Sequence, residues 1–501
     1  MDETQPLLAD IPVIDVDAER CDEIPLKDLV DFNADGDDEN PMEWPSAYKW
    51  GIAALLALMA FTVTFTCISV VPIANRIAKD LDNGQSSKSS SVLLVTIWEL
   101  GEAAGPLFIA PLSEVFGRYP VINGANLLFI FATVLAALSN NAILFIAARA
   151  LTGVAVASNV LNPAIVGDMF PTHQRGSAIS LIAIAPLIGG AIGPAIAGAI
   201  AETVGWRRVI WMSVGLAVGC EVLFLTCFRE TYKVVVLRKK AARLRKETGN
   251  HMLKTVFDVD DGKSDVRKMW ESVLRPIIVF FGSGVLQAMS LHGAVVFSYF
   301  YIMSTTMPDI LQDIYNLSPA ATGLAFMTFS AGSTISVILM NVLVDKVYVI
   351  LRDRNKGNGV AEFRLPITII GSFALPLSMA LYGWAAELRA PLMLFLFNVG
   401  FMGFSLMFMF LPLQAYVVDA LGLWAASGMT AVIVTRCLMS TFLPLATEPL
   451  VTAFGWGLGL TILAGVLLVL APIPILIYRY GAHWRQSSSY TKDQYTIAID
   501  E

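Results

Sequence analysis

The sequence predicts an all-α membrane protein of twelve transmembrane helices arranged in two six-helix bundles. Three observations predict it. Of the 501 residues, 56% are hydrophobic and only 15% are charged, whereas an ordinary soluble domain has about 25% charged residues. From Trp50 onward, apolar runs long enough to cross a bilayer alternate with short polar breaks. One longer polar interval, 229–275, separates six such runs from six more.

The apolar runs place the spans and divide the chain. The spans lie near 50–72, 91–112, 121–138, 142–167, 176–201 and 208–228 in the first half, and near 276–304, 316–344, 365–386, 391–418, 424–447 and 455–478 in the second. The predicted units are an N-terminal tail (1–47), a first bundle (48–228), a linker (229–275), a second bundle (276–480) and a C-terminal tail (481–501). The first tail is rich in Asp and Glu and poor in aromatic residues, which predicts disorder.

The distribution of basic residues predicts the orientation. Most of the 34 Lys and Arg residues fall on the side of the membrane that holds the linker and both termini. The opposite side has only Arg76, Lys79, Lys88, Arg207, Arg208 and Arg389. Because basic residues accumulate on the cytoplasmic side, we expect both termini and the linker to be cytoplasmic. In the linker, 234–246 is either a basic amphipathic helix on the anionic inner leaflet or a solvated connection.

Composition excludes several function classes. The five cysteines have no CxxC spacing, and the four histidines form no ligand or triad pattern. No basic stripe with interleaved aromatic residues is present. We therefore expect no metal site, no cofactor, no enzymatic activity and no nucleic-acid partner, and we expect the protein to be a monomer.

The stretch 99–121 carries the most informative pattern. Gly101 and Gly105 lie on one face of an apolar helix, which allows a neighbouring backbone to approach closely. The helix leads into a turn that begins at Ala110-Pro-Leu-Ser-Glu and continues to Gly117-Arg118. This turn resembles the loop between the second and third helices of major facilitator transporters. It departs from the family pattern in lacking the first glycine and the second basic residue, where Ala110 and Tyr119 stand.

Other stretches extend the resemblance to the fungal drug:proton antiporter branch of that family. They are an intramembrane arginine and glycine in the fourth helix, the segment that follows this helix, a glycine-proline pattern in the fifth helix, and three segments in the second half. These stretches are 149–153, 167–176, 189–198, 354–366, 416–420 and 471–481. The resemblance implies the major facilitator fold and export of small amphipathic organic molecules, such as drugs, toxins or secondary metabolites, in exchange for protons.

Two alternatives to proton-coupled export remain open. They are an uptake permease for nutrients or organic acids with the same fold, and a receptor or scaffold that transports nothing. We expect the plasma membrane as the location, although an acidic dileucine pattern at 3–8 leaves the vacuolar membrane as an alternative.

Three ionisable residues lie at membrane depth, where charge is costly in lipid, and they are candidates for proton coupling. Glu99 and Glu102 share a helix face at a spacing of three, and Arg149 lies at a similar depth in the fourth helix. We expect this arginine to balance the carboxylates, either as part of proton coupling or as a static buried ion pair.

The remaining candidates form three sets. A gating network near the inner surface comprises Glu114, Gly117, Arg118, Asp168 and Arg175. The fifth helix carries Gly189, Gly193, Pro194 and Gly198, which predict a close crossing with a neighbouring helix. These residues either let the helix bend as the halves rock or serve close packing alone. Candidates for lining a substrate cavity are Asn159, Gln287, His292, Asn398 and Arg436, of which the last is also placed to balance an acid.

Overall fold

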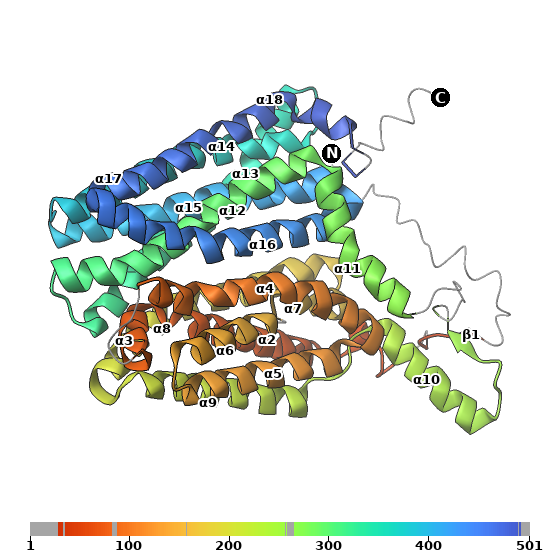
Figure 1. The fold of residues 1–501 in the computed structure, drawn as a ribbon. Coiled ribbons are helices and arrows are strands. Elements are labelled where there is room, and N and C mark those ends of the chain that lie inside the picture. Colours follow the sequence, from red (N-terminus) through yellow and green to blue (C-terminus); the bar gives the residue numbers. More distant parts are fainter. Residues whose placement is uncertain are drawn as a thin grey trace.

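The structure is a computed structural model. It describes residues 29–33, 36–82, 88–156, 158–255, 257, 265–488 and 490–491, so the dileucine pattern lies outside the described residues. Nearly all regular structure in the described part of the chain is helical. Figure 1 shows two bundles lying side by side, with the linker helices at one end.

The first bundle contains the helices drawn from red to yellow in Figure 1. They are α2 (Ser46–Ile68), α3 (Ala74–Leu81), α4 (Lys88–Phe116), α5 (Arg118–Leu138), α6 (Ala142–Val154), α7 (Ser158–Met169), α8 (Thr172–Val204) and α9 (Trp206–Cys227). The fourth span, predicted as one run over 142–167, is divided between α6 and α7.

The linker and the second bundle follow. The linker helix is α10 (Lys233–Thr248). The second bundle contains α11 (Asp265–Gly282), α12 (Gly284–Asp309), α13 (Pro319–Arg354), α14 (Leu365–Glu387), α15 (Leu392–Leu421), α16 (Ala425–Phe442), α17 (Thr447–Leu470) and α18 (Pro472–Gln486). The predicted span 276–304 was wrong at its start, because the chain breaks at Ser283, whose side chain caps α12 by accepting from the Leu286 amide.

Short segments of 3₁₀ or π geometry join these helices. They are η2 (Pro41–Glu43), η3 (Val71–Ile73), η5 (Ile310–Ile314), η6 (Ala361–Arg364), η7 (Gly422–Trp424) and η8 (Leu443–Ala446). We call the end of the bundles that carries α10 the linker end, and the opposite end the far end.

The helices of the described residues account for all twelve predicted spans. Ten stretches are long and apolar enough to cross a bilayer, and the shorter apolar helix α6 supplies, with α7, one more. One stretch, Ala425–Gln486, has 62 residues and turns at Gly455, whose φ of +78° favours glycine. Gly455 lies inside the range given for α17 and divides it into a short helix before the turn and a longer helix after it. Glu387 Oε2 accepts hydrogen bonds from the amides of Trp456 (2.8 Å) and Gly457 (3.3 Å) at the start of the longer helix. This stretch therefore crosses twice.

Glycines allow close helix crossings within and between the bundles. A Cβ on Gly153 of α6 would lie 1.9 Å from the carbonyl oxygen of Trp98 on α4, so no larger residue fits there. Between the bundles, a Cβ on Gly198 of α8 would lie 2.3 Å from the carbonyl oxygen of Pro319 on α13, and one on Gly323 would lie 2.1 Å from that of Pro194. The backbones of α8 and α13 are thus in direct contact between the halves.

The prediction of disorder for the whole N-terminal tail was wrong for its last part. Strand β1 (Leu29–Val30) pairs in parallel with β2 (Lys254–Thr255) of the linker. Asp37 forms a 2.6 Å ion pair with Lys240 of α10, in which both side chains are buried. Burial alone would raise the pKa of Asp37, but Lys240 and the backbone amides of Glu39 and Asn33 hold it below its usual value. Acidic residues that repel one another in isolation are neutralised here by the basic helix.

The C-terminal boundary also differs from the prediction. The last helix continues past residue 480 to Gln486. Arg485 forms a buried ion pair of 2.8 Å with Glu362, which fastens α18 to the segment before α14. The final helix therefore belongs to the second bundle rather than to a free tail.

Candidate functional site

Two contacts of acidic side chains join the halves near the middle of the bundle, beside a hydrogen bond from the Thr96 hydroxyl to the carbonyl of Thr441 (3.1 Å). Glu99 of α4 accepts a 2.6 Å hydrogen bond from the hydroxyl of Tyr301 on α12. One turn further along α4, Glu102 Oε1 lies 3.2 Å from a guanidinium nitrogen of Arg436 on α16. Glu99, Glu102 and Tyr301 are almost fully buried, and the side chain of Arg436 is 15% exposed. The two glutamates thus share a face, as their spacing predicts, and that face meets the other half.

The groups around Glu99 and Glu102 determine the net charge of this cluster. The Arg436 guanidinium lies 4.5 Å from the centre of the Phe297 ring, a cation–π contact. The sulfur of Cys437 lies within 4.8 Å of carboxylate oxygens of both glutamates. Two carboxylates beside one guanidinium carry one excess negative charge when both are ionised. The described residues around them therefore suit one additional positive charge.

The predicted pairing of Arg149 with these glutamates was wrong. Its guanidinium instead donates to three backbone carbonyls, those of Leu94 (3.2 Å), Thr66 (3.3 Å) and Cys67 (2.8 Å). Two of these belong to the last turn of α2, where carbonyls lack a helical partner and the helix dipole is negative. Arg149 therefore satisfies a helix end inside the first bundle, and Arg436 is the arginine beside the carboxylates.

The turn after α4 brings part of the predicted gating network together at the linker end. Arg118 forms a 3.2 Å ion pair with Asp168 and donates to the hydroxyl of Ser113 (2.5 Å). Gly117 has a φ of +98°, and a Cβ there would collide with the carboxylate of Glu230 at 2.3 Å. Glu230 in turn accepts from the amide of Arg118 (2.8 Å), which anchors the linker to the start of α5.

Two members of the predicted network lie outside this cluster. Glu114 is exposed. Arg175 donates to the carbonyls of Phe170 and Gly167, both at 2.9 Å, and so caps the end of α7. Glu230 was missed because it lies in the linker, 112 residues from the turn it caps.

The glycines of the fifth span lie at close contacts, as predicted. A Cβ on Gly189 would lie 2.9 Å from the carbonyl oxygen of Phe61 on α2, and one on Gly193 would lie 3.4 Å from that of Phe65. Pro194 and Gly198 meet α13 as described above. One helix therefore contacts α2 on one side and the second bundle on the other.

Most of the predicted cavity residues are used inside the second bundle. Gln287 donates to the carbonyl of Phe280 (3.1 Å), His292 bonds to the hydroxyl of Ser372 (3.0 Å), and Asn398 donates to the carbonyl of Ser378 (3.0 Å). These side chains satisfy polar groups between neighbouring helices, and their role in lining a substrate cavity stays a prediction. The side chain of Asn159 lies outside the described residues. Among the five candidates, Arg436 is the one placed between the halves.

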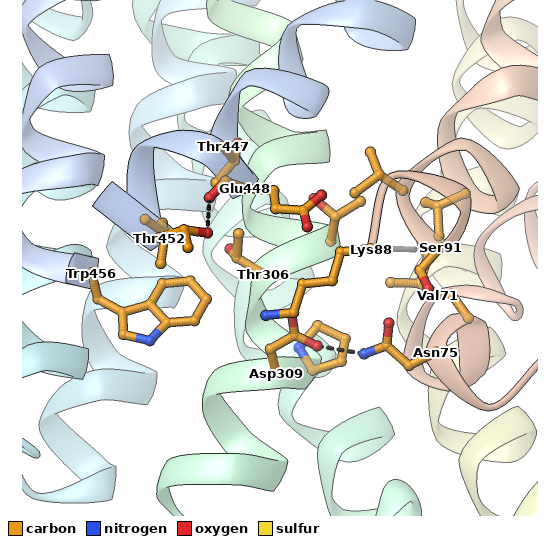
Figure 2. A pocket seen from close by; sticks show the side chains of 16 residues that line it. Val71, Asn75, Lys88, Ser91, Thr306, Asp309, Thr447, Glu448, Thr452 and Trp456 are labelled. Carbon is orange, nitrogen blue, oxygen red and sulfur yellow. Dashed lines mark hydrogen bonds between the residues drawn. The ribbon is translucent and has the colours of Figure 1, made fainter. Parts of the chain in front are cut away.

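A second group of cross-half contacts closes the far end. Asn75 of α3 donates a hydrogen bond to Asp309 at the end of α12. Gln312 donates to the carbonyl of Pro72 (3.3 Å), and Ser89 donates to Glu448 (3.1 Å). Figure 2 shows a pocket at this position, lined from both halves. Its lining includes Val95, Asn75, Lys88, Thr305, Asp309, Glu448 and Trp456.

The pocket ends close to the contact between Glu99 and Tyr301. Val95 lies one helical turn before Glu99, and Thr305 lies one turn after Tyr301, so each is about 6 Å along its helix from the pair. The sequence did not reveal this arrangement, because Asp309 lies in the polar break between two predicted spans, Tyr301 lies in an apolar run, and neither stretch indicates a partner in the first half. The only signal was the presence of polar atoms in a long apolar helix.

Comparison with known proteins decides the family. The sequence model of the Major Facilitator Superfamily matches residues 52–444. The chain belongs to this superfamily. It is a multi-pass membrane transporter of small molecules and not an enzyme, as the sequence predicted.

Relatives and solved structures agree with this assignment. The MFS transporter cpaT of Aspergillus oryzae is 33% identical over 93% of this chain and 93% of its own length. The efflux pump radE of Floropilus chiversii is 30% identical, with coverage of 91% and 85%. A crystal structure of a D-xylose-proton symporter superposes with a TM-score of 0.65 at 16% identity, covering 85% of this chain and 97% of that one. At that identity the likeness shows the fold alone.

Proposed function

We propose that this transporter exports small amphipathic organic molecules, such as toxins or secondary metabolites, and takes up protons in exchange. One observation carries the proposal. Two buried carboxylates, Glu99 and Glu102, stand between the halves with one guanidinium, that of Arg436, so the cluster has a place for one proton. The efflux pump among the relatives supports export as the direction.

The proposed cycle is alternating access. The halves rock about close contacts such as those of α8, so that the central cluster faces one side of the membrane and then the other. A carboxylate that takes a proton from outside and releases it inside drives the return step. Protonation also removes a charge whose cost at the membrane centre is roughly 2.5–3.5 kcal/mol on insertion scales.

The test uses a yeast strain deprived of its own efflux pumps. A screen with a panel of amphipathic toxins identifies a compound to which the expressed chain confers resistance. That compound is then loaded into liposomes with the purified protein under a pH gradient. We expect uphill movement that Glu99→Gln abolishes, because glutamine mimics the protonated acid, whereas substrate-for-substrate exchange persists. Full gradient-driven transport by Glu99→Gln, Glu102→Gln and the double variant would refute proton coupling through this cluster.

A matched control comes from another buried acid. Glu221 of α9 is 3% exposed and accepts a 2.8 Å hydrogen bond from Asn126 of α5, inside the first bundle. Because it does not lie between the halves, Glu221→Gln should retain proton-driven transport. Loss of coupling in this variant as well would mean that any buried carboxylate matters.

We further propose that the protein works as a monomer in the plasma membrane with the linker end in the cytoplasm, which the excess of basic residues at that end supports. Single cysteines placed at Lys246 and at Leu388, both exposed, lie at the linker end and the far end. In a background with Cys227 replaced by serine, a membrane-impermeant maleimide should label only the cysteine at 388 on intact cells. The reverse labelling would invert the proposed orientation.

A further inference from the structure

We infer that Tyr301 makes proton binding at Glu99 depend on the arrangement of the two halves, so that the ionised carboxylate is favoured when the far end is closed and the protonated form when it is open. This inference rests on the proposed proton coupling. It assigns to a tyrosine of the second bundle a role in proton release that the carboxylates alone do not explain.

The contact itself is short, buried and formed across the halves. The Tyr301 hydroxyl donates to Glu99 Oε1 at 2.6 Å, and both side chains are at most 2% exposed. A hydroxyl donor stabilises a carboxylate more than a neutral carboxylic acid. The hydrogen bond therefore favours the ionised form of Glu99 for as long as α4 and α12 stay together.

The tyrosine is held firmly on its own helix. Its ring packs edge-on against Phe300 at 4.9 Å and also contacts Phe297. Its backbone carbonyl accepts from the hydroxyl of Thr305 (2.8 Å). Movement of α12 relative to α4 must therefore move the hydroxyl, because the side chain has little freedom to follow Glu99.

The same helix carries a far-end contact between the halves. Asp309, which accepts from Asn75, lies eight residues beyond Tyr301, or about 12 Å along α12. The far end cannot open without separating Asp309 from α3. An opening that separates α12 from the first bundle at that level will also lengthen the contact between Tyr301 and Glu99.

The other charged groups around Glu99 do not replace this donor. Glu102 lies beside it on α4, and Cys437 and Arg436 face it from α16, with the guanidinium 3.2 Å from Glu102. Arg149 on α6 is held by the backbone carbonyls described above. Both Tyr301 and the thiol of Cys437 bond to Glu99 from the opposite half, and of these two Tyr301 is the one on the helix that carries the far-end contact.

This arrangement has the sign that proton-driven export needs. With the far end open, Glu99 loses its donor and holds a proton from outside more firmly. With the far end closed, the donor returns, and the proton leaves toward the linker end. Each turn of the cycle thus moves a proton inward, and the ion pair between Arg436 and Glu102, which also crosses the halves, opens and closes in the same movement.

The decisive experiment compares Tyr301→Phe with Tyr299→Phe. Tyr299 lies on the same helix, is fully buried, and donates to the carbonyl of Leu463 (2.5 Å) rather than to an acid. Hydrogen bonds to charged groups change an equilibrium by roughly tenfold to a hundredfold. In liposomes, Tyr301→Phe should therefore shift the pH of half-maximal proton-driven transport to a more alkaline value by about one unit or more, whereas Tyr299→Phe should leave it unchanged.

A second measurement does not require transport. Spin labels on the exposed residues Val204 and Leu388 report the separation of the halves at the far end in the purified full chain. At alkaline pH, Tyr301→Phe should populate the open far end more than the wild type does. At acidic pH, where Glu99 is neutral, the two proteins should agree.

The outcomes separate this inference from the proposed function. If Glu99→Gln abolishes proton-driven transport but Tyr301→Phe shifts neither the pH profile nor the label distances, the inference is overturned and proton coupling stands. If the variant alters the distances equally at both pH values, Tyr301 is only a structural contact. If Glu99→Gln and Glu102→Gln both retain coupling, the proposed function itself fails.

Discussion

Removing the charge of Arg436 alone should destabilise the protein more than removing the charges of Glu102 and Arg436 together. The two side chains are 3.2 Å apart, and their exposed fractions are 2% and 15%. In Arg436→Gln the buried carboxylates of Glu99 and Glu102 lose the guanidinium beside them, and breaking a buried ion pair in this way costs roughly 3–5 kcal/mol. In the double variant Glu102→Gln/Arg436→Gln, neither charge remains, and most of that loss should be recovered.

The assay is the temperature at which purified protein loses its monodisperse form in detergent, measured with cell-surface abundance. The expected order of stability is wild type, then the double variant, then Arg436→Gln. Glu221→Gln is the control, because the partner of Glu221 is the uncharged amide of Asn126 and no charge is left without its partner. A double variant that is as unstable as the sum of the two single variants would show that the pair contributes nothing as a pair.

Two further predictions test the crossing of the halves and the attachment of the N-terminal segment. Gly198→Leu should reduce transport more than abundance, because its Cβ meets the carbonyl of Pro319 at 2.3 Å, whereas Gly215→Leu, with nothing within 4 Å of its Cβ, should alter neither; equal losses of transport and abundance would indicate packing alone. The pKa of Asp37 is lowered by folding, so its ion pair with Lys240 should stabilise the N-terminal segment above about pH 4 and be lost as the pH falls below that value. Limited proteolysis of the linker should accelerate in Lys240→Glu and slow again when Asp37→Lys is added, and a failure of this rescue would contradict the pairing.

The positions of the spans could be predicted from sequence because each depends on local properties. Length, apolarity and polar breaks are read from one segment at a time. The predictions failed where a boundary depends on a cap or a distant partner. Ser283 starts a new helix inside the predicted seventh span, and the ion pair of Arg485 with Glu362 accompanies a last helix that continues beyond the predicted end at 480. Such contacts involve side chains whose partners cannot be identified from hydropathy.

The N-terminal segment illustrates the same limit at a larger distance. Its acidic composition predicts a chain without a core, and that prediction ignores what the segment can bind. The partner of Asp37, Lys240, lies 203 residues further along the chain. Charge complementarity between two polar segments becomes visible only when the fold brings α10 beside the first span.

The choice between the two intramembrane arginines shows why depth alone does not identify a coupling residue. Arg149 and Arg436 both lie within predicted spans, and depth counted from the chain favoured the first. Arg149, however, binds carbonyls of α2 and α4, which belong to its own half, so its contacts persist when the halves rock. Arg436 meets Glu102 across the halves, so its contact changes with every opening. A charge whose partner never changes balances the membrane cost in all states equally. Only a pair that the motion breaks can make protonation depend on conformation, and the search for coupling residues in this transporter therefore belongs on the faces where α4 meets α12 and α16.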